Sequence, residues 1–201
     1  MKTLIIAVSL ILLFSAGTSH AQRLSSQEKN FARVLTISDR AGDARLVIPA
    51  GFQHRECALV IVSHAREAKP ADELHNPPYP DFFHALGAAG YVLLLSEDSG
   101  DEDWGNAAAL RSVERVFNKA RERFKWNRTI FMLGLSMGGL PATLTAYRGT
   151  LKTPVNAVAL IAARVNLADA YTAPAERRAA IEAAYATDVK PNFDPQKLIT
   201  N

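Results

Sequence analysis

Hydrophobic residues along the chain fall into short continuous runs that alternate with longer segments of helical periodicity. Four apolar runs predict buried strands, because a strand covered on both faces of a sheet is hydrophobic throughout; they are 58–63, 91–95, 129–133 and 155–162. Helices are predicted between and after them, at 80–89, 106–124, 139–148 and 175–186. Two earlier strands, 33–38 and 45–48, flank a turn at 40–43. This alternation predicts an α/β fold with a mainly parallel sheet and right-handed crossovers.

One of these apolar runs, 129–133, leads directly into a glycine-rich turn. The residues Gly134-Leu135-Ser136-Met137-Gly138 match the pattern G-x-S-x-G, and Gly139 follows them. Where a strand turns into a helix at this pattern, it is a nucleophile elbow: the serine Oγ stands clear of a cramped turn whose neighbours lack side chains. The N–H groups at the start of the following helix add partial positive charge where an oxyanion would form. Ser136 is therefore the candidate nucleophile.

Polar residues follow each strand of the predicted parallel sheet. Ser63-His64-Ala65-Arg66 follows the first strand, Ser96-Glu97-Asp98 the second and Ser136 the third, and the fourth leads into the segment after Ala163. In open parallel sheets, ligands bind beyond the carboxyl ends of the strands. The sequence therefore predicts a site at this edge, with Glu97 and Asp98 interpreted as loop carboxylates that could line a pocket.

Composition and charge limit the other functions. The length of 201 residues and 48% hydrophobic content suit one domain with a core. The net charge is only +3, with no run of Lys or Arg, which argues against a nucleic-acid partner. Cys57 is the only cysteine and no His-x-x-x-His spacing occurs, so no metal or cofactor is expected. Three aromatic residues could line a substrate site, but packing in the core is the favoured interpretation; they are Trp104, Tyr79 and Phe82.

The N-terminus has the pattern of a targeting segment. Lys2 precedes an apolar run at 4–14, and Ser19-His20-Ala21 supplies small residues at the −3 and −1 positions of a cleavage site. The sequence predicts a signal peptide at 1–21 and a mature domain at 22–201, exported to the periplasm or the extracellular space. An uncleaved anchor is the alternative, although the run is short for a membrane span, and no stable span is expected after cleavage.

With these pieces in place, residues 44–163 resemble the α/β-hydrolase superfamily, most like secreted bacterial esterases and dienelactone-hydrolase-like members. Gly134 to Gly139 is typical of the family's elbow, and 58–65 is similar to its third strand and His-Gly oxyanion loop. In this chain that loop reads His64-Ala65, without the glycine. The resemblance implies an α/β-hydrolase-type, mainly parallel sheet with helices on both faces, lacking the last strands.

The resemblance also implies an activity and its residues. Ser136 would be the nucleophile in hydrolysis of a small-molecule carboxylic ester, or an amide, through an acyl-enzyme. The backbone N–H of Met137 would be one oxyanion donor, and that of Arg66, or less favourably Ala65, the other. The oligomeric state is left open.

The base of a catalytic triad is missing from the sequence. In this fold the acid and the histidine follow the serine, yet all five histidines, His20, His54, His64, His75 and His84, precede Ser136. One explanation is a C-terminally truncated chain, and another is a non-catalytic relative that binds a partner. A third is that His64 or His75 acts as base from an unusual direction. Asp169 is a candidate acid, although a surface or helix-cap role is favoured. The 201 residues are expected to be inactive alone.

Overall fold

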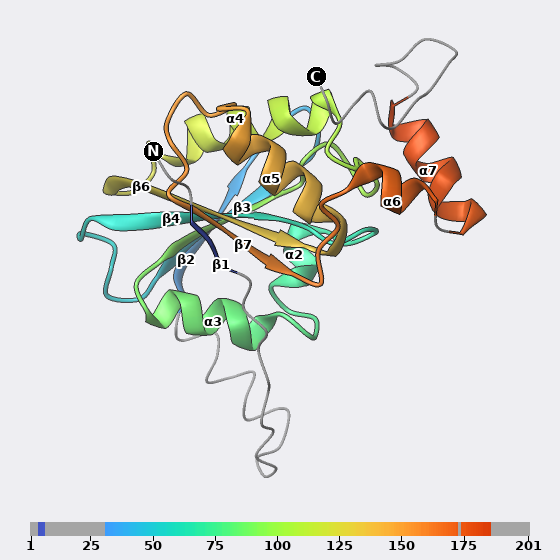
Figure 1. Cartoon of the computed structure of the whole chain (residues 1–201). Coiled ribbons are helices and arrows are strands. Elements are labelled where there is room, and N and C mark those ends of the chain that lie inside the picture. The colour runs from blue at the N-terminus through green and yellow to red at the C-terminus, as the bar shows by residue number, and fades with distance from the viewer. Residues whose placement is uncertain (1–3, 7–30, 173, 186–201) are drawn as a thin grey trace.

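A seven-stranded sheet runs through the middle of the molecule, with helices on both of its faces (Figure 1). The structure is a computed structural model, and it describes residues 4–6, 31–172 and 174–185. The strands are β1 (Leu4–Ile6), β2 (Phe31–Ile37), β3 (Ala44–Pro49), β4 (Cys57–Ser63), β5 (Val92–Ser96), β6 (Trp126–Leu135) and β7 (Ala157–Ile161). The helices are α2 (Pro70–Glu73), α3 (Pro80–Ala88), α4 (Ala107–Ala120), α5 (Gly139–Tyr147), α6 (Leu167–Tyr171) and α7 (Ala175–Tyr185).

The predicted α/β fold is confirmed, and most element boundaries agree to within a few residues. The largest difference lies between α4 and β6. The helix ends at Ala120 rather than at 124, because the Arg123 N–H closes a turn on the Ala120 carbonyl and the chain then enters β6 at Trp126. The short helices α2 and α6 were not predicted. In both, an extended residue precedes the first turn, and in α6 the Asn166 side chain accepts from the Ala168 N–H.

The strand order β1-β7-β6-β4-β5-β3-β2 combines a parallel and an antiparallel part. Strands β4, β5, β6 and β7 are parallel, whereas β3 runs antiparallel to both β5 and β2. The register pairs Ser63 with Ser96 on one side and with Gly134 on the other, so these three strands end at the same level. The turn between β2 and β3 lies at this same edge, because β3 starts beside the end of β5. Every polar segment predicted to follow a strand therefore reaches one edge of the sheet.

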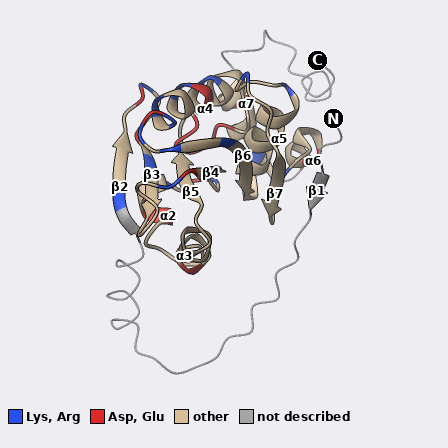
Figure 2. Cartoon of the chain, turned by 90° about the vertical axis from the view of Figure 1, so that its left-hand side faces the viewer, with Lys and Arg blue, Asp and Glu red and all other residues tan. Residues whose placement is uncertain are grey.

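Alternating side chains on the strands form two separate hydrophobic cores. On one face, α4 and α5 cover the sheet, and Val113, Val116 and Phe117 of α4 pack against residues such as Ile61. On the other face, α3 packs against a second set of strand residues, with Phe83 at its centre. The apolar positions of α4 face the first core, while basic and acidic residues are interspersed over its outer surface (Figure 2).

Strand β1 lies beside β7 at one end of the sheet and pairs with it in parallel. Its three residues belong to the predicted signal peptide; the rest of that segment, 1–3 and 7–21, lies outside the described residues. The signal peptide and export therefore stay predictions. Residues 22–30 and 186–201 of the predicted domain also lie outside the description. After β7 the described chain forms α6 and α7 and no further strand, in agreement with the expected shortened sheet. Among the described helices, none has the length and apolar character to span a bilayer.

Candidate functional site

The backbone at Ser136 is strained in the manner of a nucleophile elbow. Ser136 has a φ of +50°, in the left-handed region that residues with a side chain seldom adopt. It opens the 3₁₀ turn Ser136–Gly138, which connects the end of β6 to the start of α5. Such strain persists only where the surrounding structure enforces it, and it is most common at functional sites. The predicted strand–turn–helix arrangement is present, with Ser136 at the sheet edge where the polar segments meet.

Two glycines of the elbow are required by close packing of backbone against backbone. A Cβ on Gly138 would lie 2.1 Å from the Ser63 carbonyl oxygen, and one on Gly134 would lie 2.6 Å from the Cα of Gly139. Real Cβ atoms do not approach other atoms this closely, so a side chain at 138 would force the turn away from β4, and one at 134 would push the start of α5 away from β6. The G-x-S-x-G pattern is thus explained by the absence of space around the turn.

The loop that follows β4, residues 64–68, faces this turn and contains the other candidate oxyanion donor. The Ala65 N–H donates to Oε1 of the buried Glu73 at 3.2 Å, and the Glu67 N–H donates to the Asp101 carbonyl at 2.9 Å. The N–H of Arg66, between them, donates to no acceptor within the described part of the chain. Of the two candidates from the sequence, Arg66 therefore has the available N–H and Ala65 does not.

His64 lies at the start of this loop and is completely buried. Its Nδ1 is 2.6 Å from the Ala65 carbonyl oxygen, and its Nε2 is 3.1 Å from that of Glu97. A carbonyl oxygen can only accept a hydrogen bond, so both ring nitrogens must donate and the ring must be protonated. A doubly protonated, enclosed imidazole has no lone pair to take a proton from a serine. The geometry therefore gives no support to His64 as a base.

Two buried carboxyl groups, Asp98 and Asp103, lie beside His64. Asp103 Oδ2 is 3.8 Å from His64 Nε2, and Asp103 Oδ1 accepts from the Gly105 N–H at 2.7 Å. Asp98 is buried near the Ser63 and Ser96 hydroxyls, whose contacts favour its charged form less strongly than burial disfavours it. Burial by itself disfavours the imidazolium, but the negative charge shared by the Asp98 and Asp103 pair, together with the Ala65 carbonyl, outweighs it and raises the pKa of His64 to about 9. We call His64, Asp98 and Asp103 the buried cluster.

The carboxylates of the buried cluster do not share one protonation state. Burial and the neighbouring Asp103 raise the pKa of Asp98 to about 8, so at neutral pH Asp98 is a neutral acid. Burial also raises the pKa of Asp103, but the His64 imidazolium and the Gly105 N–H favour its charged form. Of the two carboxyl groups, Asp103 is thus the one whose charged form is favoured by contacts with His64 and the Gly105 N–H.

The buried cluster has the donor types of a metal site, which the sequence did not indicate. One nitrogen and two carboxylate oxygens lie within 4.8 Å of one another. A metal would need a free nitrogen lone pair on His64, however, and both ring nitrogens face carbonyl oxygens. In this arrangement the imidazolium itself is the cation between the two carboxyl groups.

The helix side of the elbow is covered by α6 and α7. Met137 and Leu140 pack with Trp104, Leu167 and Ile181 in a third hydrophobic cluster. Two hydrogen bonds attach α7 to the loop before α4: Tyr185 Oη donates to the Trp104 carbonyl at 2.9 Å, and Asn106 Nδ2 donates to the Ala184 carbonyl at 2.8 Å. Water is thereby excluded from one side of the turn that carries Ser136.

No protein-family model matches the sequence, and no curated protein matches it. Solved structures do match. A dienelactone hydrolase from Anabaena variabilis is 19% identical, with 77% of this chain and 79% of that one covered and a TM-score of 0.50. Esterase B from Lactobacillus rhamnosis is 15% identical, with 89% and 64% covered and a TM-score of 0.55. Est1E from Butyrivibrio proteoclasticus is 15% identical, with 81% and 59% covered and a TM-score of 0.54. The chain has the α/β-hydrolase fold.

The α/β-hydrolase fold predicted by the resemblance is thus confirmed, and at these identities the likeness is one of fold. The chain spans less than two thirds of the length of both esterases. In the α/β-hydrolase fold the carboxyl edge of the parallel strands is where sites form, and here that edge brings together Ser136, the 64–68 loop and the buried cluster.

Several other residues singled out in the sequence have different positions in this hydrolase fold. Asp98 does not line a pocket as predicted but is fully buried, because the loop after β5 folds back over His64. Glu97 is partly buried, and burial raises its pKa. Trp104 is core packing, as expected. Tyr79 and Phe82 pack against Phe83 on the α3 face.

The remaining candidates for a triad show no link to Ser136. Asp169 is an exposed residue in the first turn of α6, where its N–H lies 3.4 Å from Asn166 Oδ1, as expected of a residue near a helix cap. His54 and His75 are exposed, and His84 lies on α3. Within the described residues, no hydrogen bond joins a histidine to Ser136. Asp103 and Glu73, which shape the site, carried no signal in the sequence.

Proposed function

We propose that this chain carries the nucleophile of a serine hydrolase that acts on small carboxylic esters. Ser136 Oγ would attack the ester carbonyl carbon, the alcohol would leave with a proton, and water would then release the acyl group from Ser136. The observation that carries the proposal is the φ of +50° at Ser136. The turn around it connects a strand to a helix and is packed so closely that a side chain at position 134 or 138 would not fit.

Two backbone N–H groups would stabilise the negative charge that develops on the ester oxygen. The Met137 N–H lies in the first turn of a helical segment, where N–H groups lack intrahelical acceptors. The Arg66 N–H is the second donor, and it is favoured over Ala65 because Glu73 already accepts from Ala65. A donor of this kind contributes roughly 2.7–4 kcal/mol to transition-state stabilisation. The Ala65 position in place of the family's glycine is compatible with this role, since a backbone donor needs no glycine.

The general base is the part of the mechanism that the described residues do not supply. All histidines precede Ser136 in the sequence, and His64 has no lone pair to offer. We therefore propose that the 201 residues alone do not turn over substrate at an appreciable rate. An activated ester would still acylate Ser136 slowly, and the acyl group would persist because deacylation needs a base as well. Export by the predicted signal peptide completes the proposal.

The test is site-resolved acylation by p-nitrophenyl acetate. The protein is incubated with the ester, and peptide mapping by mass spectrometry locates the added acetyl groups. We expect acetylation of Ser136 to exceed that of Ser38, an exposed serine directly after β2, by at least about tenfold. The Ser136→Ala variant should lose that label alone, and Ser38→Ala should keep it.

Acetyl groups on lysines and none on Ser136 would overturn the nucleophile and favour a hydrolase-fold protein that binds a partner without catalysis. Rapid, steady release of p-nitrophenol that Ser136→Ala abolishes would support the nucleophile. The same result would disprove the proposed inactivity, and a base within the 201 residues would then have to be found.

A further inference from the structure

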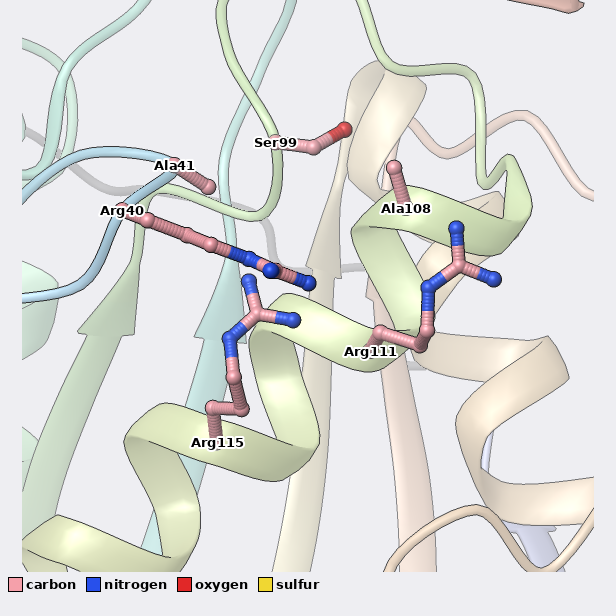
Figure 3. A pocket seen from close by; sticks show the side chains of 6 residues that line it. All are labelled: Arg40, Ala41, Ser99, Ala108, Arg111 and Arg115. Atoms are coloured by element: carbon pink, nitrogen blue, oxygen red, sulfur yellow. The ribbon is translucent and has the colours of Figure 1, made fainter. Parts of the chain in front are cut away.

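A hollow lies on the surface beside α4, and Ser136 is not among the residues that line it. It has a volume of about 280 Å³ and is lined by Arg40, Ala41, Ser99, Ala108, Arg111 and Arg115 (Figure 3). Three separate segments form it: the turn between β2 and β3, the loop after β5, and the first half of α4. We call it the arginine pocket. Pockets for drug-sized ligands are typically about 300–1,000 Å³, so this pocket suits a small ligand.

The arginine pocket has more positive charge than its acidic neighbour neutralises. Asp39 accepts from Arg115 Nε at 2.8 Å and from Arg115 Nη2 at 2.6 Å, and it also lies 3.8 Å from Lys119 Nζ. Asp39 is thereby fully engaged. Arg40 and Arg111 form no ion pair within the described residues. Figure 3 shows the Arg40 and Arg115 side chains reaching toward one another across the pocket. Like charges that converge repel, unless an anion lies between them.

Neutral donors complete the arginine pocket. Ser99 Oγ lies 3.4 Å from Asn106 Oδ1, a long hydrogen bond that the hydroxyl could exchange for a ligand. Ala108 belongs to the first turn of α4, whose 14 residues direct the positive end of a helix dipole toward this region. Asn106 caps that helix by accepting from the Ala109 N–H, so the Ala108 N–H remains one of the first-turn donors without an intrahelical acceptor.

We propose that the arginine pocket binds a tetrahedral oxyanion of the phosphate class, either as the free ion or as a phosphate monoester. The planar fork of arginine matches the oxygens of such an anion in pairs, and charge-assisted hydrogen bonds of this kind are about twice as strong as neutral ones. A helix N-terminus is a recurrent partner of phosphate groups. The site is independent of ester hydrolysis at Ser136, and it would bind its ligand whether or not Ser136 reacts.

The occupied pocket would also restrain the loop between β5 and α4. Ser99 directly follows Asp98 of the buried cluster, and the same loop carries Asp103 and Trp104. A phosphate bridging Arg40, Arg111 and Ser99 would join this loop to the β2–β3 turn and to α4. Ligand binding should therefore raise thermal stability in addition to giving a binding signal.

The proposal is tested by isothermal titration calorimetry of the full chain with sodium phosphate and with glycerol 3-phosphate. The ionic strength is kept low and constant, because salt screens the charges of an exposed site and weakens anion binding. Sodium chloride at matched ionic strength is the blank. We expect saturable binding and a rise in melting temperature with phosphate. The double variant Arg40→Gln/Arg111→Gln should bind about tenfold or more weakly. Arg123→Gln removes an exposed charge in the turn after α4 and should bind within about twofold of the parent chain.

Each outcome decides something. Equal affinity for both ligands assigns the pocket to the free ion, and tighter binding of glycerol 3-phosphate assigns it to a phosphate carried by a larger molecule. No saturable heat with either ligand would overturn the proposal. So would equal weakening in Arg123→Gln and the double variant, because that would indicate general charge attraction. Circular dichroism verifies that the variants are folded, which is expected since both arginines are exposed.

Discussion

The molecule contains two ionic clusters that differ in nearly every physical respect. In the first, Asp39 joins Arg115 and Lys119 and attaches the β2–β3 turn to α4 near the surface. In the buried cluster, His64, Asp98 and Asp103 have little or no contact with solvent. We call the first the surface cluster. Each oxygen of Asp39 accepts a charge-assisted hydrogen bond from Arg115, whereas the oxygens of Asp98 form no such bond with a cation in the described part of the chain.

This difference appears in the protonation of the two sets of carboxyl groups. The hydrogen bond from Arg115 lowers the pKa of Asp39 to about 2, so its charge stabilises the fold. Burial raises the pKa of Asp98 to about 8, so its charge would destabilise the fold. Clusters that are costly in this way are concentrated at functional sites, because their geometry is retained for purposes other than stability. The surface cluster stabilises a turn, and the buried cluster shapes the loop that presents the Arg66 N–H.

Removal of the buried cation should have the largest effect. His64→Leu leaves the Asp103 carboxylate buried without its counter-charge, and we expect a loss of about 3–5 kcal/mol in the free energy of unfolding. Asp98→Asn replaces a neutral acid by a neutral amide and should change it by less than about 1 kcal/mol at pH 7. Urea denaturation at pH 7 measures both. If His64→Leu does not fold, Asp98→Asn still tests the protonation assigned to the buried cluster. A loss as large as about 3 kcal/mol in the free energy of unfolding of that variant would show that Asp98 is charged.

The two clusters should respond to pH in opposite directions. His64 has a folded-state pKa of about 9 against 6.5 when unfolded, so its contribution is complete below pH 6.5 and is lost as the pH rises through 9. Asp98 acts in the same direction between about pH 4 and 8, because the folded state holds its proton more tightly. Asp39 acts oppositely: its contribution is present above pH 4 and is lost as the pH falls through 2.

We therefore expect stability to decrease at both ends of the pH scale, by on the order of 3–5 kcal/mol between pH 6.5 and 9. Urea midpoints across the pH range measure this. Asp98→Asn should flatten the slope on the alkaline side without changing the acid side. Stability that stays constant or rises between pH 6.5 and 9 would contradict the imidazolium assigned to His64.

The surface cluster should give the smallest effect. Arg115→Gln removes the paired hydrogen bonds to Asp39, but Lys119, Ser112 and the Ala41 N–H remain near the carboxylate. We expect a loss of about 1 kcal/mol at pH 7, as for a partly exposed ion pair, and almost none at pH 2. Lys119→Gln is the milder control, because Nζ is 3.8 Å away and half exposed. A larger loss in Lys119→Gln than in Arg115→Gln would reverse the assignment of partners.

The sequence was sufficient for the strands, the long helices and the elbow because their signals are local. The apolar run 129–133 predicts a buried strand, and the glycines around Ser136 predict a turn with no space for side chains at their positions. The structure contains both. Strand β6 is longer than predicted, because its polar first residues extend the strand by pairing with β4 at Cys57, which no local pattern reveals.

The buried cluster could not be predicted for the same reason. His64 meets the Glu97 carbonyl across 33 residues of sequence, and Asp98 becomes buried only when that contact folds its loop inward. A carboxylate after a strand is usually exposed, which made the pocket-lining interpretation of Asp98 reasonable and wrong. The choice between Ala65 and Arg66 as donors depended on Glu73, which lies on a helix too short to leave a pattern.

The close approach of Gly138 to the Ser63 carbonyl also bears on how the protein folds. This contact joins residues 75 positions apart, and it exists only after β4 and β6 have paired side by side. Contacts of such long sequence separation form late, because the entropy of loop closure must be overcome first. The left-handed turn at Ser136 has little to enforce it before then. The chain should thus acquire the left-handed turn at Ser136 in the last steps of folding, after β4 and β6 have paired.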